Sequence, residues 1–251
     1  MRNRRANVYA VMLLLGSSLA APSVGWAVTG GASLQPSGAS ASPTAVAHAG
    51  DVAVTATANG VTLASTASAM LRTQLRFSGS ASGSAAGATI EIERLGRETG
   101  WSWAPTVSTV VGANGSFTAV WQTNHIGRFS VRAVIEQAAS SQAALAVPTV
   151  APTLIVTVYR PSIATWFGPG LYGRKTACGV VLRPTTLGTA NRTLKCGTPV
   201  AIYYRGRTIV VPVIDRGPYA NGADWDLTQA TARALDTGGI STIGAVSMPP
   251  R

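Results

Sequence analysis

Apolar and polar residues alternate in short runs along the chain after residue 50. Turn signals separate the runs, and the clearest are Asn59-Gly60, Ser78-Gly79 and Asn114-Gly115. A period of two places alternate side chains on one face of a strand, and runs at this spacing are typical of a two-sheet sandwich. The runs are Val52–Ala58, Leu71–Phe77, Thr89–Arg94, Ser116–Trp121, Arg128–Ile135 and Leu154–Val158. We therefore predict an immunoglobulin-like β-sandwich over residues 51–159.

A second all-β domain is predicted over residues 160–251. Val200–Tyr204 and Thr208–Ile214 are rich in β-branched and aromatic residues, and they flank a turn signal at Arg205-Gly206-Arg207, which together predict a hairpin. Thr228–Leu235 has helical spacing of apolar residues, with its first residue suited to be the N-cap. The domain is expected to hold one short helix.

The N-terminal residues have the pattern of an export signal. Met1–Arg5 is positively charged, Val8–Leu19 is apolar, and small residues follow up to Ala27. We expect a signal peptide over residues 1–27, because the apolar run is shorter than the roughly 18 residues that a membrane span needs. The Gly-, Ser- and Ala-rich residues 28–50 are expected to be a flexible linker. The mature protein is predicted to be secreted, extracellular or periplasmic, with no membrane span.

The positive charge is concentrated in the C-terminal domain. Removing residues 1–27 takes away three arginines and lowers the formal charge from +11 to +8. Residues 160–251 carry nine Arg, two Lys and four Asp, a balance of +7, whereas residues 51–159 have six Arg against five acids. A basic domain on an exported protein is attracted to teichoic acids or to the carboxylates of peptidoglycan stem peptides. No nucleic-acid recognition motif is present, so nucleic acid is not expected as a partner.

The cysteine and histidine content bounds the chemistry further. Cys178 and Cys196 are the only cysteines, and an even count in an exported chain predicts a disulfide. His48 and His125 are the only histidines, and they lie far apart in the sequence. Neither has neighbouring residues in a spacing that would complete a metal site. No metal and no cofactor are expected.

Short Gly-, Pro- and aromatic-containing motifs follow one another in a fixed order after residue 160. They are Trp166-Phe-Gly-Pro-Gly170, Gly173-Arg-Lys-Thr-Ala177, Arg192-Thr-Leu194 with Gly197-Thr198, Asp215-Arg-Gly-Pro-Tyr219 and Asp226-Leu-Thr228. This order resembles the rare lipoprotein A (RlpA) family, whose domain is a six-stranded double-psi β-barrel. That barrel is similar to the first domain of expansins and to septal ring lytic transglycosylases. The resemblance implies a groove that binds cell-wall glycan.

The resemblance also implies which residues line the groove. Asp215 and Asp226 match the two aspartates of the family groove, and the second is linked to acid catalysis in the expansin and transglycosylase relatives. Three other positions depart from the family pattern, because Val180, Arg183 and Asn191 stand where a Glu, an Asp and a His are found. Hydrolysis by paired carboxylates is therefore poorly supported.

Aromatic and polar residues in or beside the motifs are the candidates for substrate binding. Aromatic faces stack on sugar rings, although each such residue can equally be part of the core. The candidates are Trp166, Tyr172, Asn191, Arg216, Tyr219 and Trp225.

Three functions fit the sequence. The first is a cell-wall protein that binds peptidoglycan strands and cleaves them as a lytic transglycosylase through Asp226 or Asp215, a reaction for which one tuned acid/base suffices. The second is a non-catalytic, expansin-like binding or loosening module, which the departures at Val180, Arg183 and Asn191 favour. The third is a secreted inhibitor or adhesin that only presents loops.

Overall fold

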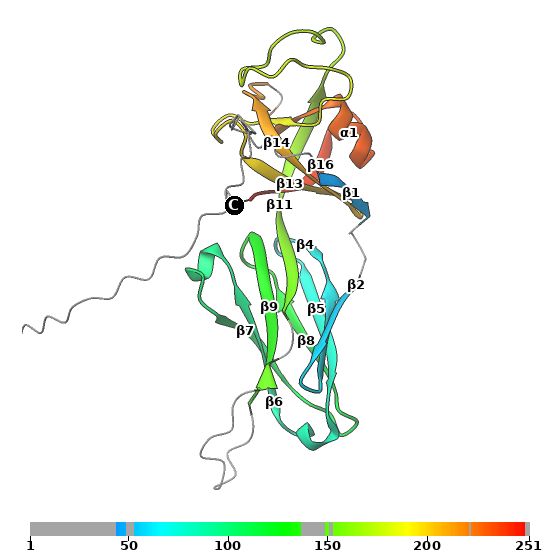
Figure 1. The fold of residues 1–251 in the computed structure, drawn as a ribbon, viewed down its shortest axis with the longest axis vertical. Helices are drawn as coiled ribbons and strands as arrows, with labels where there is room; N and C mark the ends of the chain where they lie inside the picture. Colours follow the sequence, from blue (N-terminus) through cyan, green and yellow to red (C-terminus); the bar gives the residue numbers. More distant parts are fainter. Residues whose placement is uncertain (1–43, 49–52, 137–148, 151–152, 221, 249–251) are drawn as a thin grey trace, which may run out of the picture. The chain divides into compact units, whose positions relative to one another are not determined.

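The protein contains a two-sheet β-sandwich followed by a closed β-barrel (Figure 1). The computed structural model describes residues 44–48, 53–136, 149–150, 153–220 and 222–248. One sandwich sheet has the order β2-β3-β5-β8, and the other contains β11-β9-β6-β7. The sandwich strands are β2 (Ala53–Ala58), β3 (Val61–Thr66), β4 (Ser68–Met70), β5 (Gln74–Ala81), β6 (Thr89–Leu95), β7 (Ala104–Val110), β8 (Ser116–Gln122), β9 (Gly127–Glu136), β10 (Thr149–Val150) and the first part of β11 (Leu154–Phe167), with 3₁₀ turns at Gly83–Ala85 and Arg97–Thr99.

Alternation along the strands produces the core of the sandwich. In β8 every second residue is buried, and Trp121 of this strand meets Phe129 of the facing sheet edge-to-face, with ring centroids 5.9 Å apart. The six predicted runs fall on strands, except that Leu71–Thr73 forms a turn and Val52 lies outside the described residues. Strands β3, β4, β7 and β10 were not predicted. In β7 a register shift opposite Ile92 and Glu93 breaks the period of two on which the prediction depends.

Strand β11 belongs to both halves of the molecule. Its first residues pair with β9 up to Val158 and with β4 up to Tyr159, and from Arg160 onward it pairs with β16. The change of partners thus occurs within one continuous strand of 14 residues. Pro161 follows directly, and a residue without an N–H is tolerated where the ladder changes. The boundary predicted at Arg160 lies within this strand, so the two halves meet without a connecting loop.

Six strands close the barrel. Their order is β15-β12-β14-β13-β16-β11, and a further pairing of β11 with β15 closes the ring. The pairs β11–β15 and β12–β14 are parallel, and the others are antiparallel. The remaining elements are β12 (Thr189–Ala190), β13 (Pro199–Tyr204), β14 (Arg207–Asp215), β15 (Trp225–Thr228), α1 (Gln229–Leu235) and β16 (Ser241–Ser247). The predicted all-β fold, with a six-stranded barrel and a short helix, is confirmed.

The local predictions in the barrel also hold. The hairpin β13–β14 turns at Arg205-Gly206, and both residues have positive φ (43° and 80°), as in the type I′ turn that suits twisted strands. Helix α1 starts after Thr228, whose Oγ1 accepts a hydrogen bond from the N–H of Thr231 at 3.2 Å. Leu235 of the helix is fully buried in the barrel core, which holds α1 against the strands.

Part of the predicted linker is a strand. Residues Thr44–His48 form β1, which pairs antiparallel with β14 of the barrel. The predicted signal peptide, residues 1–27, and the rest of the predicted linker lie outside the described residues. Within the described part of the chain, no helix has the length and apolar character needed to cross a membrane.

A small cluster connects the two halves beside β11. Tyr159 is buried and stacks on Tyr203 of β13, with ring centroids 5.3 Å apart and an interplanar angle of 26°. Gly244 of β16 lies so close that a Cβ there would be 2.6 Å from the Cβ of Tyr159 and 2.9 Å from the sulfur of Met70. The close approach of β16 to β11 therefore requires a glycine at this position.

Gly244→Ala is expected to lower the free energy of unfolding by about 1–3 kcal/mol, because an added methyl overpacks a filled core. Denaturant titration followed by Trp fluorescence measures the change. Gly238→Ala is the matched control, since its Cβ would meet nothing within 4 Å. Equal stability of the two variants would contradict this account of the junction.

Candidate functional site

The two predicted carboxylates lie in one row across the barrel wall. Strand pairing sets Thr165 of β11 opposite Asp226 of β15, Asp226 opposite Ala190 of β12, and Ala190 opposite Asp215 of β14. Neighbouring strands are about 4.8 Å apart, which puts the aspartate backbones roughly 10 Å apart. A register irregularity between Thr189 and Ala190 of β12 interrupts the simple alternation of faces next to Asp215. The structure thus brings Asp215 and Asp226 together, although 11 positions separate them in the sequence.

Asp226 lies on the outer face of the barrel, since its neighbours Trp225 and Leu227 are buried in the core. Its side chain is half-buried, and Oδ1 accepts a hydrogen bond from Thr165 Oγ1 at 2.6 Å. Burial raises the pKa of Asp226 above its ordinary value of 3.8, and the negative charge of Asp215 raises it further, against the opposing effect of the Thr165 hydrogen bond. The surroundings of Asp226 therefore stabilise its protonated form relative to that of an exposed aspartate.

Asp215 is held at the end of β14 by main-chain donors. Its Oδ1 accepts hydrogen bonds from the N–H of Ala177 at 2.9 Å and from its own neighbour Arg216 at 2.8 Å. The two aspartates thus lie in different environments, one hydrogen-bonded to the backbone and one half-buried beside a hydroxyl.

The loop that supplies Ala177 is attached to β14 and to its neighbouring loop. Cys178 and Cys196 form a disulfide, with Cα atoms 5.7 Å apart, as predicted. The N–H of Cys178 also donates to the carbonyl of Ile214 at 3.3 Å. On the other side, Arg216 Nη2 lies 3.3 Å from Cys196 Sγ. These contacts keep the donor to Asp215 in place.

The predicted aromatic residues separate into different places. Trp166 is 38% exposed and lines a shallow hollow of about 310 Å³ with Gln229 and Arg233, on the face of β11 opposite to Thr165. Tyr172 donates a hydrogen bond from its hydroxyl to Gln229 Oε1 at 2.6 Å.

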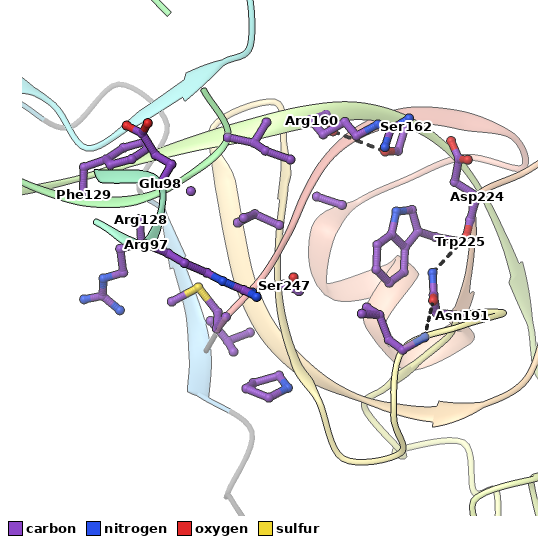
Figure 2. A pocket seen from close by; sticks show the side chains of 18 of the residues that line it. Arg97, Glu98, Arg128, Phe129, Arg160, Ser162, Asn191, Asp224, Trp225 and Ser247 are labelled. Atoms are coloured by element: carbon purple, nitrogen blue, oxygen red, sulfur yellow. Dashed lines mark hydrogen bonds between the residues drawn. The ribbon is translucent and has the colours of Figure 1, made fainter. Parts of the chain in front are cut away.

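The other two aromatic candidates differ sharply in burial. Tyr219 is 79% exposed, whereas Trp225 is 8% exposed and belongs to the barrel core. A ring so buried has little face left for stacking on a sugar, although Trp225 contributes to the wall of a pocket (Figure 2).

Asn191 and Arg216 make structural contacts near the row. Asn191 Oδ1 accepts from the N–H groups of Thr193 and Leu194, and its Nδ2 points to the carbonyl of Asp224 at 3.5 Å (Figure 2). Arg216 Nη1 lies 3.4 Å from the carbonyl oxygens of Asn191 and Asp215. The amide of Asn191 thus organises the loop that follows β12.

The positions that depart from the family pattern carry no acid or base. Val180 is half-buried in the loop after Ala177, and its N–H donates to Thr176 Oγ1 at 3.2 Å. The side chain of Arg183 is exposed. Within the described residues, no group of three or more His, Cys, Asp or Glu side chains could hold a metal ion.

Thr165 and Gln229 are the contacts that sequence reasoning missed. Thr165 donates a hydrogen bond to Asp226, and Gln229 accepts one from the Tyr172 hydroxyl. Gln229 directly follows Asp226-Leu-Thr228, so proximity to that motif was a usable signal for it. Thr165 meets Asp226 through the parallel pairing of β11 with β15, which no local sequence pattern predicts.

Comparisons with known proteins match the same part of the chain. The family model described as "Lytic transglycolase", a double-psi β-barrel model, matches residues 162–246. The "Probable endolytic peptidoglycan transglycosylase RlpA" of Synechocystis sp. is 43% identical over 75 residues, which are 29% of this chain and 23% of the relative. The C-terminal domain is an RlpA-like double-psi β-barrel.

Two further relatives match this RlpA-like barrel. The protein of the same name from Aquifex aeolicus is 38% identical over 79 residues, 31% of this chain and 35% of the relative. The "Endolytic peptidoglycan transglycosylase RlpA" of Campylobacter jejuni is 36% identical over 76 residues, 30% of this chain and 28% of the relative. The matches therefore cover between 23% and 35% of the length of these three relatives.

Among solved structures, the chain is similar to the Streptomyces papain inhibitor (SPI). The two share 26% sequence identity with a TM-score of 0.29, and the match covers 36% of this chain and 93% of the inhibitor.

Replacing both cysteines of the RlpA-like barrel, Cys178→Ala with Cys196→Ala, is expected to destabilise the protein by about 3 kcal/mol. The bridge closes a loop of 18 positions, and loop closure restricts the unfolded chain. Denaturant unfolding of the oxidised protein and the double variant provides the measurement. Identical midpoints for the two proteins would disprove the stabilising role.

Asp226→Asn is expected to raise the melting temperature at pH 7. A carboxyl whose pKa is raised on folding binds more protons in the folded than in the unfolded chain, so the stability of the fold falls as the pH rises above 3.8. The amide of Asn does not titrate and removes this effect. The difference in melting temperature between the variant and the unsubstituted protein should therefore vanish below pH 3.8. Thermal unfolding at several pH values measures it.

Asp236→Asn is the control for this pH series. Asp236 is largely exposed and is the left-handed C-cap of α1, a conformation that Asn also tolerates. A pH-dependent difference of the same size in this variant would show that burial of Asp226 is not the cause.

Proposed function

We propose that this protein is a secreted, cell-wall-associated enzyme that binds peptidoglycan glycan strands across the Asp226–Asp215 row and cleaves them by lytic transglycosylation. The observation that carries the proposal is the half-buried Asp226, whose pKa is raised by burial and by the charge of the nearby Asp215. A general acid that works near neutral pH needs this kind of environment.

In the first step, Asp226 protonates the glycosidic oxygen that follows an N-acetylmuramic acid residue. The bond between that oxygen and C1 breaks, and positive charge develops at C1 and the ring oxygen. Thr165 holds the acid through its hydrogen bond to Oδ1, so that the other carboxyl oxygen can be the one that faces the substrate. The negative charge of Asp215, which already acts on Asp226, favours the developing cation.

In the second step, the 6-hydroxyl of the same muramic acid attacks C1, and Asp226, now a carboxylate, accepts the proton of that hydroxyl. The product is a 1,6-anhydro sugar, and the enzyme returns to its starting protonation state. Because the nucleophile belongs to the substrate, no second protein group has to activate a water. Loss of an acid or base at Val180, Arg183 and Asn191 is compatible with this route.

The proposal is supported by what the relatives are named. Three similar proteins carry the name endolytic peptidoglycan transglycosylase, and their matched segments correspond to the barrel. The balance of +7 on residues 160–251 suits a polymer that bears carboxylates. A peptidoglycan substrate implies an extracellular or periplasmic location.

The test is release of anhydro-muropeptides from purified sacculi, detected by mass spectrometry. Asp226→Asn is expected to lower the rate at least about 100-fold, because general acid catalysis contributes that much. Asp215→Asn is expected to lower it roughly tenfold or more through loss of the charge that faces the cation. Asp236→Asn, which changes a largely exposed carboxylate outside the row, should leave the rate unchanged.

Sacculus binding by the same proteins separates enzyme from binder. If the unsubstituted protein binds sacculi but releases no anhydro product, the catalytic proposal is wrong and the expansin-like, non-catalytic function replaces it. If Asp226→Asn retains full activity, another residue is the acid.

A further inference from the structure

A cavity that does not include the Asp226–Asp215 row lies beside β11. Its volume is about 1010 Å³, at the upper end of the sizes usual for ligand pockets. Neither Asp215 nor Asp226 lines it. Its wall includes residues of the sandwich, of β11 and of the barrel loop Asn191–Leu194 (Figure 2).

The lining of this cavity has an excess of unneutralised positive charge. Four arginines face two acids, and both acids already have partners in the protein. Glu98 Oε1 lies 2.6 Å from Arg94 Nε, and Glu98 Oε2 lies 3.4 Å from His125 Nε2. Asp224 Oδ2 accepts a hydrogen bond from the N–H of Ile163 at 3.2 Å, and Asp224 Oδ1 lies 3.9 Å from Arg192 Nη2.

Three of the four arginines are available to a ligand. Arg192 already donates to the carbonyls of Pro218 and Ala223. Within the described residues, the exposed guanidinium groups of the other three make no ion pair, side-chain hydrogen bond or ring contact. They are Arg97, Arg128 and Arg160.

The cavity also presents apolar surface. Trp101 is 56% exposed, and Ile126 and Ile155 are exposed as well. Trp101 has a φ of 61°, an uncommon conformation for a bulky residue. Large apolar side chains left uncovered around a concave site mark a place where a partner binds.

The two sides of the cavity are held together by main-chain pairing. Arg160 and Ile155 lie on β11, which pairs with β9 and β16. The N–H of Leu71 donates to the carbonyl of Tyr159 at 2.8 Å, beside the Tyr159–Tyr203 stack. Arg97, Arg128 and Arg160 all line this one cavity.

We propose that this cavity binds the carboxylate-bearing stem peptide of peptidoglycan. Three unpaired guanidinium groups suit a ligand with several carboxylates, which they can bind by two parallel hydrogen bonds each. The exposed Trp101 and isoleucines suit the aliphatic side chains of a peptide, whereas a polyol phosphate chain has no apolar groups to cover them. The inference rests on the wall polymer being the ligand of the protein, and it assigns the peptide to this cavity and the glycan to the carboxylate row.

The test is calorimetric titration of the full chain with soluble ligands. The probes are a disaccharide–peptide, the free stem peptide, and the same peptide with its carboxylates amidated. Arg97→Gln, Arg128→Gln and Arg160→Gln are each expected to weaken peptide binding about two- to fivefold, as for exposed ion pairs, and the triple variant roughly tenfold or more. Amidation of the peptide should weaken binding to the unsubstituted protein to the same extent as the triple variant.

Arg76→Gln is the matched control, because it removes the same charge from an exposed position on β5 outside the cavity. It should leave the affinity unchanged, and near-ultraviolet circular dichroism checks that all variants fold. Amidated peptide that binds as tightly as the free acid, or arginine variants that behave like Arg76→Gln, would overturn the proposal. Binding of teichoic acid in place of the peptide would also overturn it.

The outcome is independent of cleavage. Peptide binding that depends on the arginines, together with no anhydro product from sacculi, would leave the cavity proposal standing and refute only the proposed catalysis. Anhydro release with no peptide binding would do the reverse.

Discussion

The hydrogen-bonded ladder along β11 is the interaction on which the rest of the structure depends. A strand of 14 residues is roughly 45 Å long, and nearly every main-chain group along it needs a partner if it is to be buried. Strands β9 and β4 supply partners to the first part, and β16 and β15 supply them to the second. The same strand therefore completes the sandwich with its first part and closes the barrel with its second part, and no loop intervenes between the two.

The candidate site is a consequence of that closure. Asp226 is half-buried beside Thr165 only because β15 pairs in parallel with the last residues of β11. The two-residue strand β12 then sets the distance to Asp215. Burial and the like charge of Asp215 both raise the pKa of Asp226, while main-chain N–H groups hold the Asp215 carboxylate in place. The two aspartates thus have different surroundings.

The departures from the family pattern also have a physical meaning. Without a Glu, Asp or His at Val180, Arg183 and Asn191, Asp215 and Asp226 are left as the candidate acid/base groups of the row, and hydrolysis through the family's other carboxylates is disfavoured. The disulfide and Arg216 instead stabilise the loops around Asp215. Asn191 is used in the same way, because its oxygen accepts main-chain hydrogen bonds of its own loop. The face around the row is therefore rigid but contains few groups that can transfer a proton.

The sequence by itself determined the elements whose signals are local. The period-two runs, the hairpin at Arg205-Gly206, the N-cap Thr228 and the motif order around Asp215 and Asp226 depend on neighbours in the chain, and each could be found there. Only the tertiary structure decided what depends on partners distant in sequence. Trp225 is part of the core, Trp166 lies on the other face from Thr165, and Arg97, Arg128 and Arg160 meet at one cavity. Strand register and burial determine such positions, and both are set by long-range pairing that leaves no trace in local composition.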